Sequence, residues 1–193
     1  MDYTQGTEKY KRDRAKKMML WFGIISLTMT FAALISSYIV SKERRDWLES
    51  YDFPNAFIYS TLILVGSSVV LHIARSLIIK NDKGAGFVWL SVAFVMGIIF
   101  VVLQVNGFQE LTDQGYYLTG KSSNITTTFL FVIIGLHVLH VIAGFIVLIT
   151  LITQTLRGRY HSEEHVGLDI GIGFWHFLDV IWVLLFLFLY FVR

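Results

Sequence analysis

The stretch of this sequence with the clearest capacity for chemistry covers residues 175–182, which read Trp-His-Phe-Leu-Asp-Val-Ile-Trp. It places Asp179 inside an apolar run that is long enough to cross a bilayer. A carboxylate near the middle of such a helix costs roughly 2.5–3.5 kcal/mol on insertion scales, so Asp179 needs a partner. His176 lies three residues earlier and shares its helix face, whereas Trp175 and Trp182 lie on a neighbouring stripe. The cluster is therefore either a structural polar clamp between helices or a site for a ligand or a proton.

Three further histidines and one arginine lie inside apolar runs. His137 and His140 are three residues apart, as are His72 and Arg75, so each pair can face one neighbour. Histidines on different membrane spans raise the possibility of axial ligands to a buried haem, as in membrane cytochromes of the b type. The alternative is that these imidazoles form hydrogen bonds between helices or with lipid headgroups.

The patterns of most catalytic sites are missing from the sequence. Val138 and Leu139 separate His137 from His140, so the His-Glu-x-x-His zinc pattern is absent. The sequence also has no glycine-rich phosphate loop, no nucleophile elbow and no paired carboxylates. Asp179 is the only carboxylate clearly buried in a span, and a proton wire through one chain needs more ionisable stations, which argues against a small transporter. We therefore predict no catalytic residue, no cofactor-binding residue and no metal ligand in this chain.

Composition places the chain among helical membrane proteins. Of its 193 residues 55% are hydrophobic, with one proline and no cysteine, and the apolar residues form long runs. Without cysteine the chain has no disulfides and no thiolate ligands for copper, zinc or an iron–sulfur cluster. The formal net charge of +2 is uninformative as a total, but the basic residues of 1–17 adjoin an apolar run. They favour a cytoplasmic membrane anchor over nucleic-acid binding.

Five apolar runs predict an all-α polytopic membrane protein with five transmembrane helices. The chain divides into a basic cytoplasmic tail at 1–17 and a five-helix membrane domain at 18–193. Pro54 fits the start of the second span, where a missing N–H costs little. The predicted spans are about 18–40, 55–79, 85–105, 125–155 and 168–192.

Several of these motifs together resemble subunit III of the haem–copper respiratory oxidases, in its short five-helix bacterial form. The strongest is Trp175-His176-Phe177-x-Asp179-x-x-Trp182, which is similar to the family signature. Gly135-Leu136-His137-Val138-Leu139-His140-Val141 resembles the family's Gly-Phe-His-Gly-Leu-His-Val, with Val138 where glycine is usual. Similar residues to the family's are also found at Tyr38, Pro54-Asn55, Ser67-Ser68, His72, Gln104 and His165. The resemblance covers essentially the whole chain.

Two positions depart from the family pattern. Many members carry a glutamate directly after the serine of the first of these spans, where Leu27 follows Ser26. Many members also carry a glutamate three residues after the glutamine of the third span. In this chain the glutamine is Gln104, and Gly107 stands at the position of the glutamate. Any role in proton collection that the family assigns to these acids is therefore not expected here.

The resemblance implies a V-shaped bundle of helices with one arm reduced. It also implies that the subunit carries no redox centre. The chain would be the non-catalytic subunit III of a cytochrome c oxidase in aerobic respiratory electron transport. It would pack on catalytic subunit I beside the electron-accepting subunit II, hold phospholipids and sustain proton uptake, with haem and copper in the partner subunits. The residues His72, Arg75, His137, His140, Trp175, His176, Asp179 and Trp182 would then form a structural and lipid-contacting polar cluster. The equivalent subunit of a quinol oxidase or of a nitric-oxide-reductase-like complex is the alternative, and a free-standing haem b anchor is a weaker one.

The placement of charge predicts the orientation of the spans. With the N-terminus inside, eleven basic residues lie in the tail and the inner connections and five lie outside. The positive-inside rule therefore places the N-terminus in the cytoplasm and the C-terminus in the periplasm of a bacterial inner membrane.

This orientation can be tested by cysteine labelling, because the chain has no cysteine of its own. Single cysteines at Ser50, Gln114 and Arg193 should react with a membrane-impermeant thiol reagent added outside. Cysteines at Thr4 and Ser162 should react only after the membrane is opened. Labelling of position 162 from outside would reverse the orientation.

Overall fold

The computed structural model describes residues 7–44, 47–48, 53–118, 124–160 and 165–192. These residues form five helices and, within the described ranges, no strand. The helices are α1 (Glu8–Ser41), α2 (Asn55–Ile79), α3 (Lys83–Asp113), α4 (Ile125–Leu156) and α5 (Val166–Phe191). All five are long and apolar enough to cross a membrane, which confirms the predicted all-α fold with five transmembrane helices. Of the positions proposed for labelling, Thr4, Ser50, Ser162 and Arg193 lie outside the described residues.

Local side chains explain where several helices begin. The Thr7 hydroxyl accepts a hydrogen bond from the Tyr10 N–H at the start of α1, and Asp82 accepts one from the Ala85 N–H at the start of α3. These contacts satisfy amide groups that have no partner inside the helix. Pro54 directly precedes α2 and has no N–H to satisfy.

Two helices extend further than the predicted spans. Helix α3 continues to Asp113, eight residues beyond the predicted membrane span, whose own limits stay a prediction. The extra turns are held by packing, because Gln104, Gly107 and Leu111 repeat at helical spacing and are all buried. Helix α1 begins at Glu8, so residues 8–17 of the predicted tail are helical. The boundary between tail and membrane domain itself stays a prediction.

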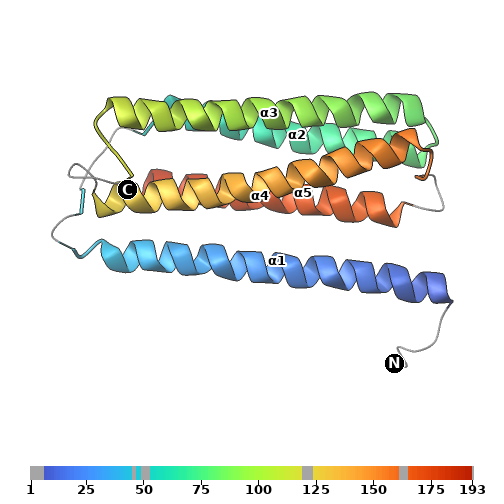
Figure 1. The fold of residues 1–193 in the computed structure, drawn as a ribbon, viewed down its shortest axis with the longest axis horizontal. Coiled ribbons are helices and arrows are strands. Elements are labelled where there is room, and N and C mark those ends of the chain that lie inside the picture. Colours follow the sequence, from blue (N-terminus) through green and yellow to red (C-terminus); the bar gives the residue numbers. More distant parts are fainter. Residues whose placement is uncertain (1–6, 45–46, 49–52, 119–123, 161–164, 193) are drawn as a thin grey trace.

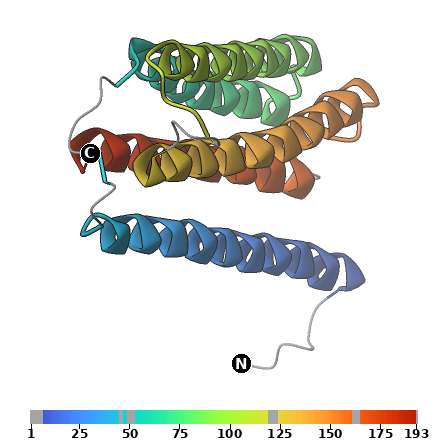
Figure 2. The same ribbon diagram turned by 60° about the vertical axis from the view of Figure 1, so that its left-hand side comes forward.

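The helices are arranged in three layers (Figure 1). Helices α2 and α3 form an antiparallel pair that packs on the pair α4 and α5, with α2 against α5 and α3 against α4. Among the described residues, helix α1 packs mainly on α4 and α5, on the side remote from α2 and α3 (Figure 2). Helix α5 therefore lies between α1 and α2, where a polar group at membrane depth can be covered. The V shape implied by the resemblance stays a prediction.

Glycines let aromatic rings pack against the backbone between the layers. A Cβ atom added at Gly97 would lie 2.8 Å from the ring of Phe145 and 2.9 Å from that of Trp175. One added at Gly107 would lie 2.6 Å from the ring of Phe57. Small residues that allow such close approach are the usual means of packing helices in lipid. The large side chains of the core thus depend on particular glycines opposite them.

Replacing Gly107 by valine should therefore destabilise the chain. Phe57 is fully buried, so its ring cannot move aside freely, and overpacking of this kind costs roughly 1–3 kcal/mol. Gly135→Val is the matched control, because a Cβ atom there meets nothing within 4 Å. Thermal unfolding in detergent should show a lower midpoint for Gly107→Val than for Gly135→Val, and equal midpoints would contradict the packing argument.

Candidate functional site

The signature residues of α5 meet a line of hydroxyl groups on α2, and we call this contact the polar seam. It consists of Thr61, Ser67, Ser68 and Arg75 of α2 with Asp169, Trp175, His176, Asp179 and Trp182 of α5. Because α2 and α5 are joined only through α3 and α4 in the chain, the seam pairs residues about a hundred positions apart.

Ser68 lies at the centre of the polar seam. Its hydroxyl donates a hydrogen bond to the Asp179 carboxylate and lies 2.9 Å from Nδ1 of His176. A hydroxyl can donate only one hydrogen bond. Because the Ser68 hydroxyl donates to Asp179, it can only accept from His176, which must then carry a proton on Nδ1. The direct distance from His176 Nδ1 to Asp179 is 3.9 Å, too long for a hydrogen bond. The predicted contact between His176 and Asp179 is therefore bridged by Ser68.

Two indole groups fasten α5 to α2 on either side of this cluster. The Trp175 N–H donates to the Ser67 hydroxyl at 3.1 Å, and the Trp182 N–H donates to the Thr61 hydroxyl at 2.9 Å. Both indoles are buried, with about 1% of their surface exposed, so each needs such an acceptor. The two tryptophans thus combine a large apolar contact with a directed hydrogen bond.

An ion pair closes the end of the polar seam at the start of α5. Arg75 Nε lies 2.7 Å from a carboxylate oxygen of Asp169 in the first turn of α5, and His165 lies 3.7 Å from the other oxygen. The pair is partly exposed, so its contribution is small, about 0–1 kcal/mol. Arg75 turns to α5, whereas His72 is exposed, so a shared role of the two stays a prediction.

His137 and His140 of α4 are not members of the polar seam, although the ring of His137 packs against Trp182. His137 is fully buried and its ring contacts Phe31, Phe100 and Trp182, with centroid distances of 6.2, 6.1 and 5.0 Å. Neither ring nitrogen of His137 has a hydrogen-bond partner among the described residues. Nδ1 of His140 lies 2.7 Å from the backbone carbonyl of Leu136, one turn back in α4. These rings are held by aromatic packing and by their own helix rather than by a histidine of another span.

The arrangement is suited to joining helices. Ser68 uses its donor and acceptor capacity within the polar seam, and both indole N–H groups are satisfied there. Within the described residues no group of three or more His, Cys, Asp or Glu side chains is placed to hold a metal ion. What the geometry offers is a clamp that holds α5 to α2 at membrane depth.

The predicted cluster lacks four members of the polar seam, namely Thr61, Ser67, Ser68 and Asp169, of which Ser67 and Ser68 were named only as family-like positions. The spacing of residues along the two helices could have indicated three of them. Thr61, Ser68 and Arg75 follow one another at intervals of seven, as do Asp169 and His176. Seven residues make about two helical turns, so each set lies along one face of its helix.

The chain is similar to a family of known proteins. The family model described as "Cytochrome c oxidase subunit III" matches residues 48–193, which contain α2 to α5. The chain is 31% identical over 171 residues to "Cytochrome c oxidase subunit 3" of Thermostichus vulcanus, covering 86% of this chain and 82% of that protein. It is 27% identical over 172 residues to the protein of that name from Corynebacterium diphtheriae, covering 86% and 82%. It is 26% identical over 174 residues to "Cytochrome bo(3) ubiquinol oxidase subunit 3" of Pseudomonas aeruginosa, covering 88% and 81%.

The bridging role of Ser68 predicts the effect of removing its hydroxyl. Ser68→Ala leaves the buried Asp179 carboxylate without its donor and should cost roughly 1–3 kcal/mol of stability. The matched control is Ser91→Ala, since the Ser91 hydroxyl bonds only to the Phe87 carbonyl of its own helix at 2.9 Å. Thermal unfolding of the chain in detergent should separate the two variants. Equal midpoints would show that the bridge contributes nothing.

Proposed function

The chain belongs to the family of cytochrome c oxidase subunit III and is a subunit of a haem–copper oxidase. We propose that it carries no redox centre of its own. The observation that carries this proposal is the polar seam. Most of its donors and acceptors at membrane depth join α2 to α5, and Ser68 donates to Oδ2 of Asp179, while Oδ1 has no partner among the described residues. Haem and copper would accordingly belong to the partner subunits.

The partners follow from the family. We propose that the chain packs on catalytic subunit I, in a complex that also contains subunit II as the electron acceptor. Cytochrome c is the proposed electron donor, supported by the relative at 31% identity that is named for a cytochrome c oxidase. A ubiquinol oxidase is the alternative, since a relative at 26% identity carries that name. A copper-bearing subunit II in the purified complex would decide for cytochrome c.

The proposed location is a bacterial inner membrane with the N-terminus in the cytoplasm. The start of α1, the turn between α2 and α3 and the end of α4 lie at the same end of the bundle (Figure 1). The basic residues of those segments are therefore gathered on one side, as the positive-inside rule requires of the cytoplasmic face.

The role in turnover would be to stabilise the working form of the catalytic subunit and to sustain its proton uptake. A subunit that binds only the native arrangement stabilises that arrangement by mass action. Of the residues predicted to contact lipid, Arg75 and one oxygen of Asp179 are occupied by contacts within the chain, and His137 and Asp179 are buried. His72 is exposed, and His140 and His176 are partly exposed, so these three are the ones that remain available to lipid or to a partner.

An oxidase stripped of this chain should start at a substantial fraction of its normal rate and then lose activity during turnover. The reason is that the chain supplies stability and proton supply rather than the oxygen chemistry. The measurement is oxygen consumption against turnover number, with and without the chain, while the haem spectrum is followed.

Two results would contradict this function. Complete loss of activity from the first turnover, with the haem spectrum intact, would mean that the chain holds a catalytic group. A stoichiometric Soret band in the chain purified alone, lost in His140→Ala, would favour a haem-binding anchor.

A further inference from the structure

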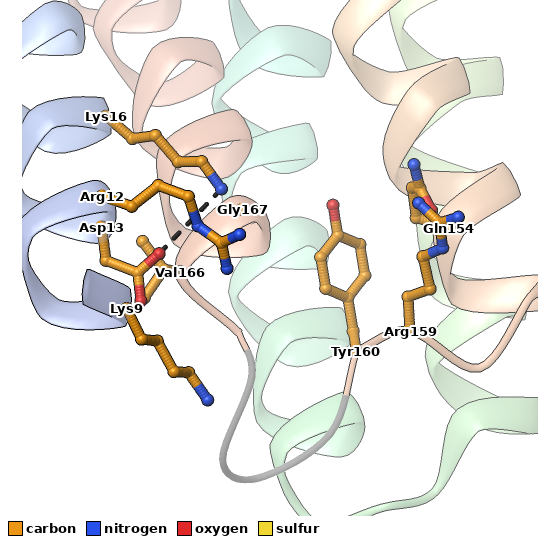
Figure 3. A pocket seen from close by; sticks show the side chains of 9 residues that line it. All are labelled: Lys9, Arg12, Asp13, Lys16, Gln154, Arg159, Tyr160, Val166 and Gly167. Carbon is orange, nitrogen blue, oxygen red and sulfur yellow. Dashed lines mark ion pairs between the residues drawn. The ribbon is translucent and has the colours of Figure 1, made fainter. Parts of the chain in front are cut away.

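Two adjoining cavities lie where the first turns of α1 meet the start of α5. The inner one has a volume of about 230 Å³ and also reaches the end of α4, and we call it the polar pocket (Figure 3). The other has a volume of about 450 Å³, and we call it the outer pocket. Lys9, Asp13 and Val166 line both, so the two cavities form one site. Together they have the size of a site for a small molecule, roughly 300–1,000 Å³.

The lining of the two cavities carries a surplus of positive charge. Among the described residues its cationic members are Lys9, Arg12, Arg14, Lys16, Lys17 and Arg159, and its one carboxylate is that of Asp13. Asp13 pairs with Lys16 at 3.9 Å, which leaves the guanidinium groups of Arg12 and Arg159 without a carboxylate partner in the described part of the chain. Figure 3 shows Arg12 reaching from α1 toward Tyr160, with Arg159 on the other side of that ring. Like charges from two elements thus face one cavity, and arginine is the side chain best matched to phosphate.

The start of α5 adds neutral donors to the polar pocket. Its N-cap His165 makes no side-chain capping bond, so the N–H groups of Val166 and Gly167 are not used by the N-cap and remain suited to an anion. Tyr160 packs on this turn, because a Cβ atom added at Gly167 would lie 3.1 Å from its hydroxyl oxygen. Burial raises the pKa of the Tyr160 phenol, and the neighbouring Arg159 lowers it by less. The phenol therefore keeps its proton at neutral pH and can donate to an anion.

The predicted membrane boundary at residue 18 leaves this part of α1 in water. Arg12 and Lys9 precede that boundary along the helix. At the rise of an α-helix they lie about 9 Å and about 14 Å beyond it. The headgroup layer on each side of a bilayer is only about 5–7 Å thick. Both side chains therefore lie where an anion dissolved in water can reach them.

We propose that this site binds a water-soluble phosphorylated anion, with a phosphate group between Arg12 and Arg159 and the rest of the molecule in the outer pocket. The bound anion would join the first half of α1 to the end of α4 and the start of α5. That half has few other attachments, because the buried residues of α1, Phe31 and Tyr38, both lie in its second half. The site is built from this chain alone and does not depend on the proposed contact with subunit I.

The first test removes the charge that faces the polar pocket. Inorganic pyrophosphate is the probe, and calorimetry at constant ionic strength measures its binding to the full-length chain with any subunits that co-purify. Arg12→Gln with Arg159→Gln should weaken binding about tenfold or more, because two charge-assisted contacts are lost. Lys80→Gln with Arg157→Gln is the matched control, since it removes the same charge from exposed positions outside both cavities. That pair should leave the affinity near the wild-type value.

The second test removes a donor without changing charge. Tyr160→Phe should weaken pyrophosphate binding roughly threefold. Tyr117→Phe removes an exposed phenol outside both cavities and should have no effect. Pyrophosphate should also raise the thermal unfolding midpoint of the wild-type chain but not that of the variant lacking both arginines, because a ligand stabilises only the form that binds it.

The source of the phosphate group is tested in lipid nanodiscs. The difference in pyrophosphate affinity between the wild-type chain and the variant lacking both arginines should persist in discs of phosphatidylcholine and in discs that also contain phosphatidylglycerol. Its disappearance in the second kind of disc would assign the polar pocket to a lipid headgroup and overturn the proposal.

Two further outcomes would also overturn it. Equal loss in the two charge pairs would show that net charge alone attracts pyrophosphate. No measurable binding of millimolar pyrophosphate to the wild-type chain would show that the site does not take a dissolved phosphate.

Discussion

The hydrogen bond from Ser68 to Asp179 is the contact on which the position of α5 depends. A carboxylate at membrane depth is too costly to leave without a donor, so α5 can rest only where a donor meets Asp179. Ser68 meets it from α2, and this contact limits how far α5 can be displaced along α2 and how it can be rotated. The indole contacts follow from that position, because Trp175 and Trp182 then lie opposite Ser67 and Thr61.

The polar seam is a repeat as well as a cluster. On α2 the polar side chains Thr61, Ser68 and Arg75 are spaced by seven residues, and on α5 Asp169 and His176 are spaced by seven. Two antiparallel helices with the same spacing bring their polar groups together at every second turn. A displacement by one turn would separate all of these pairs at once, so the repeat specifies the register more strongly than any single bond.

Hydropathy was sufficient to predict the five helices, because long apolar runs have few other structures open to them in lipid. It does not predict the end of α3, because polarity marks the edge of the membrane, whereas the helix continues as far as Asp113 with Gly107 and Leu111 still buried. The residue types of the candidate site were predicted as well, but most of their partners were not. Ser68 and Asp179 are 111 positions apart, and a helix face predicted from sequence does not show which other helix covers it.

The two positions where this chain lacks the acids of its family differ in what surrounds them. Gly107 lies against the Phe57 ring, so any larger side chain there, charged or not, competes with a fully buried aromatic. Leu27 is partly buried on α1, a helix that contributes only Phe31 and Tyr38 as buried residues. Helix α1 is therefore the least completely packed of the five. Packing within the chain constrains the side chain at position 107 far more tightly than the one at position 27.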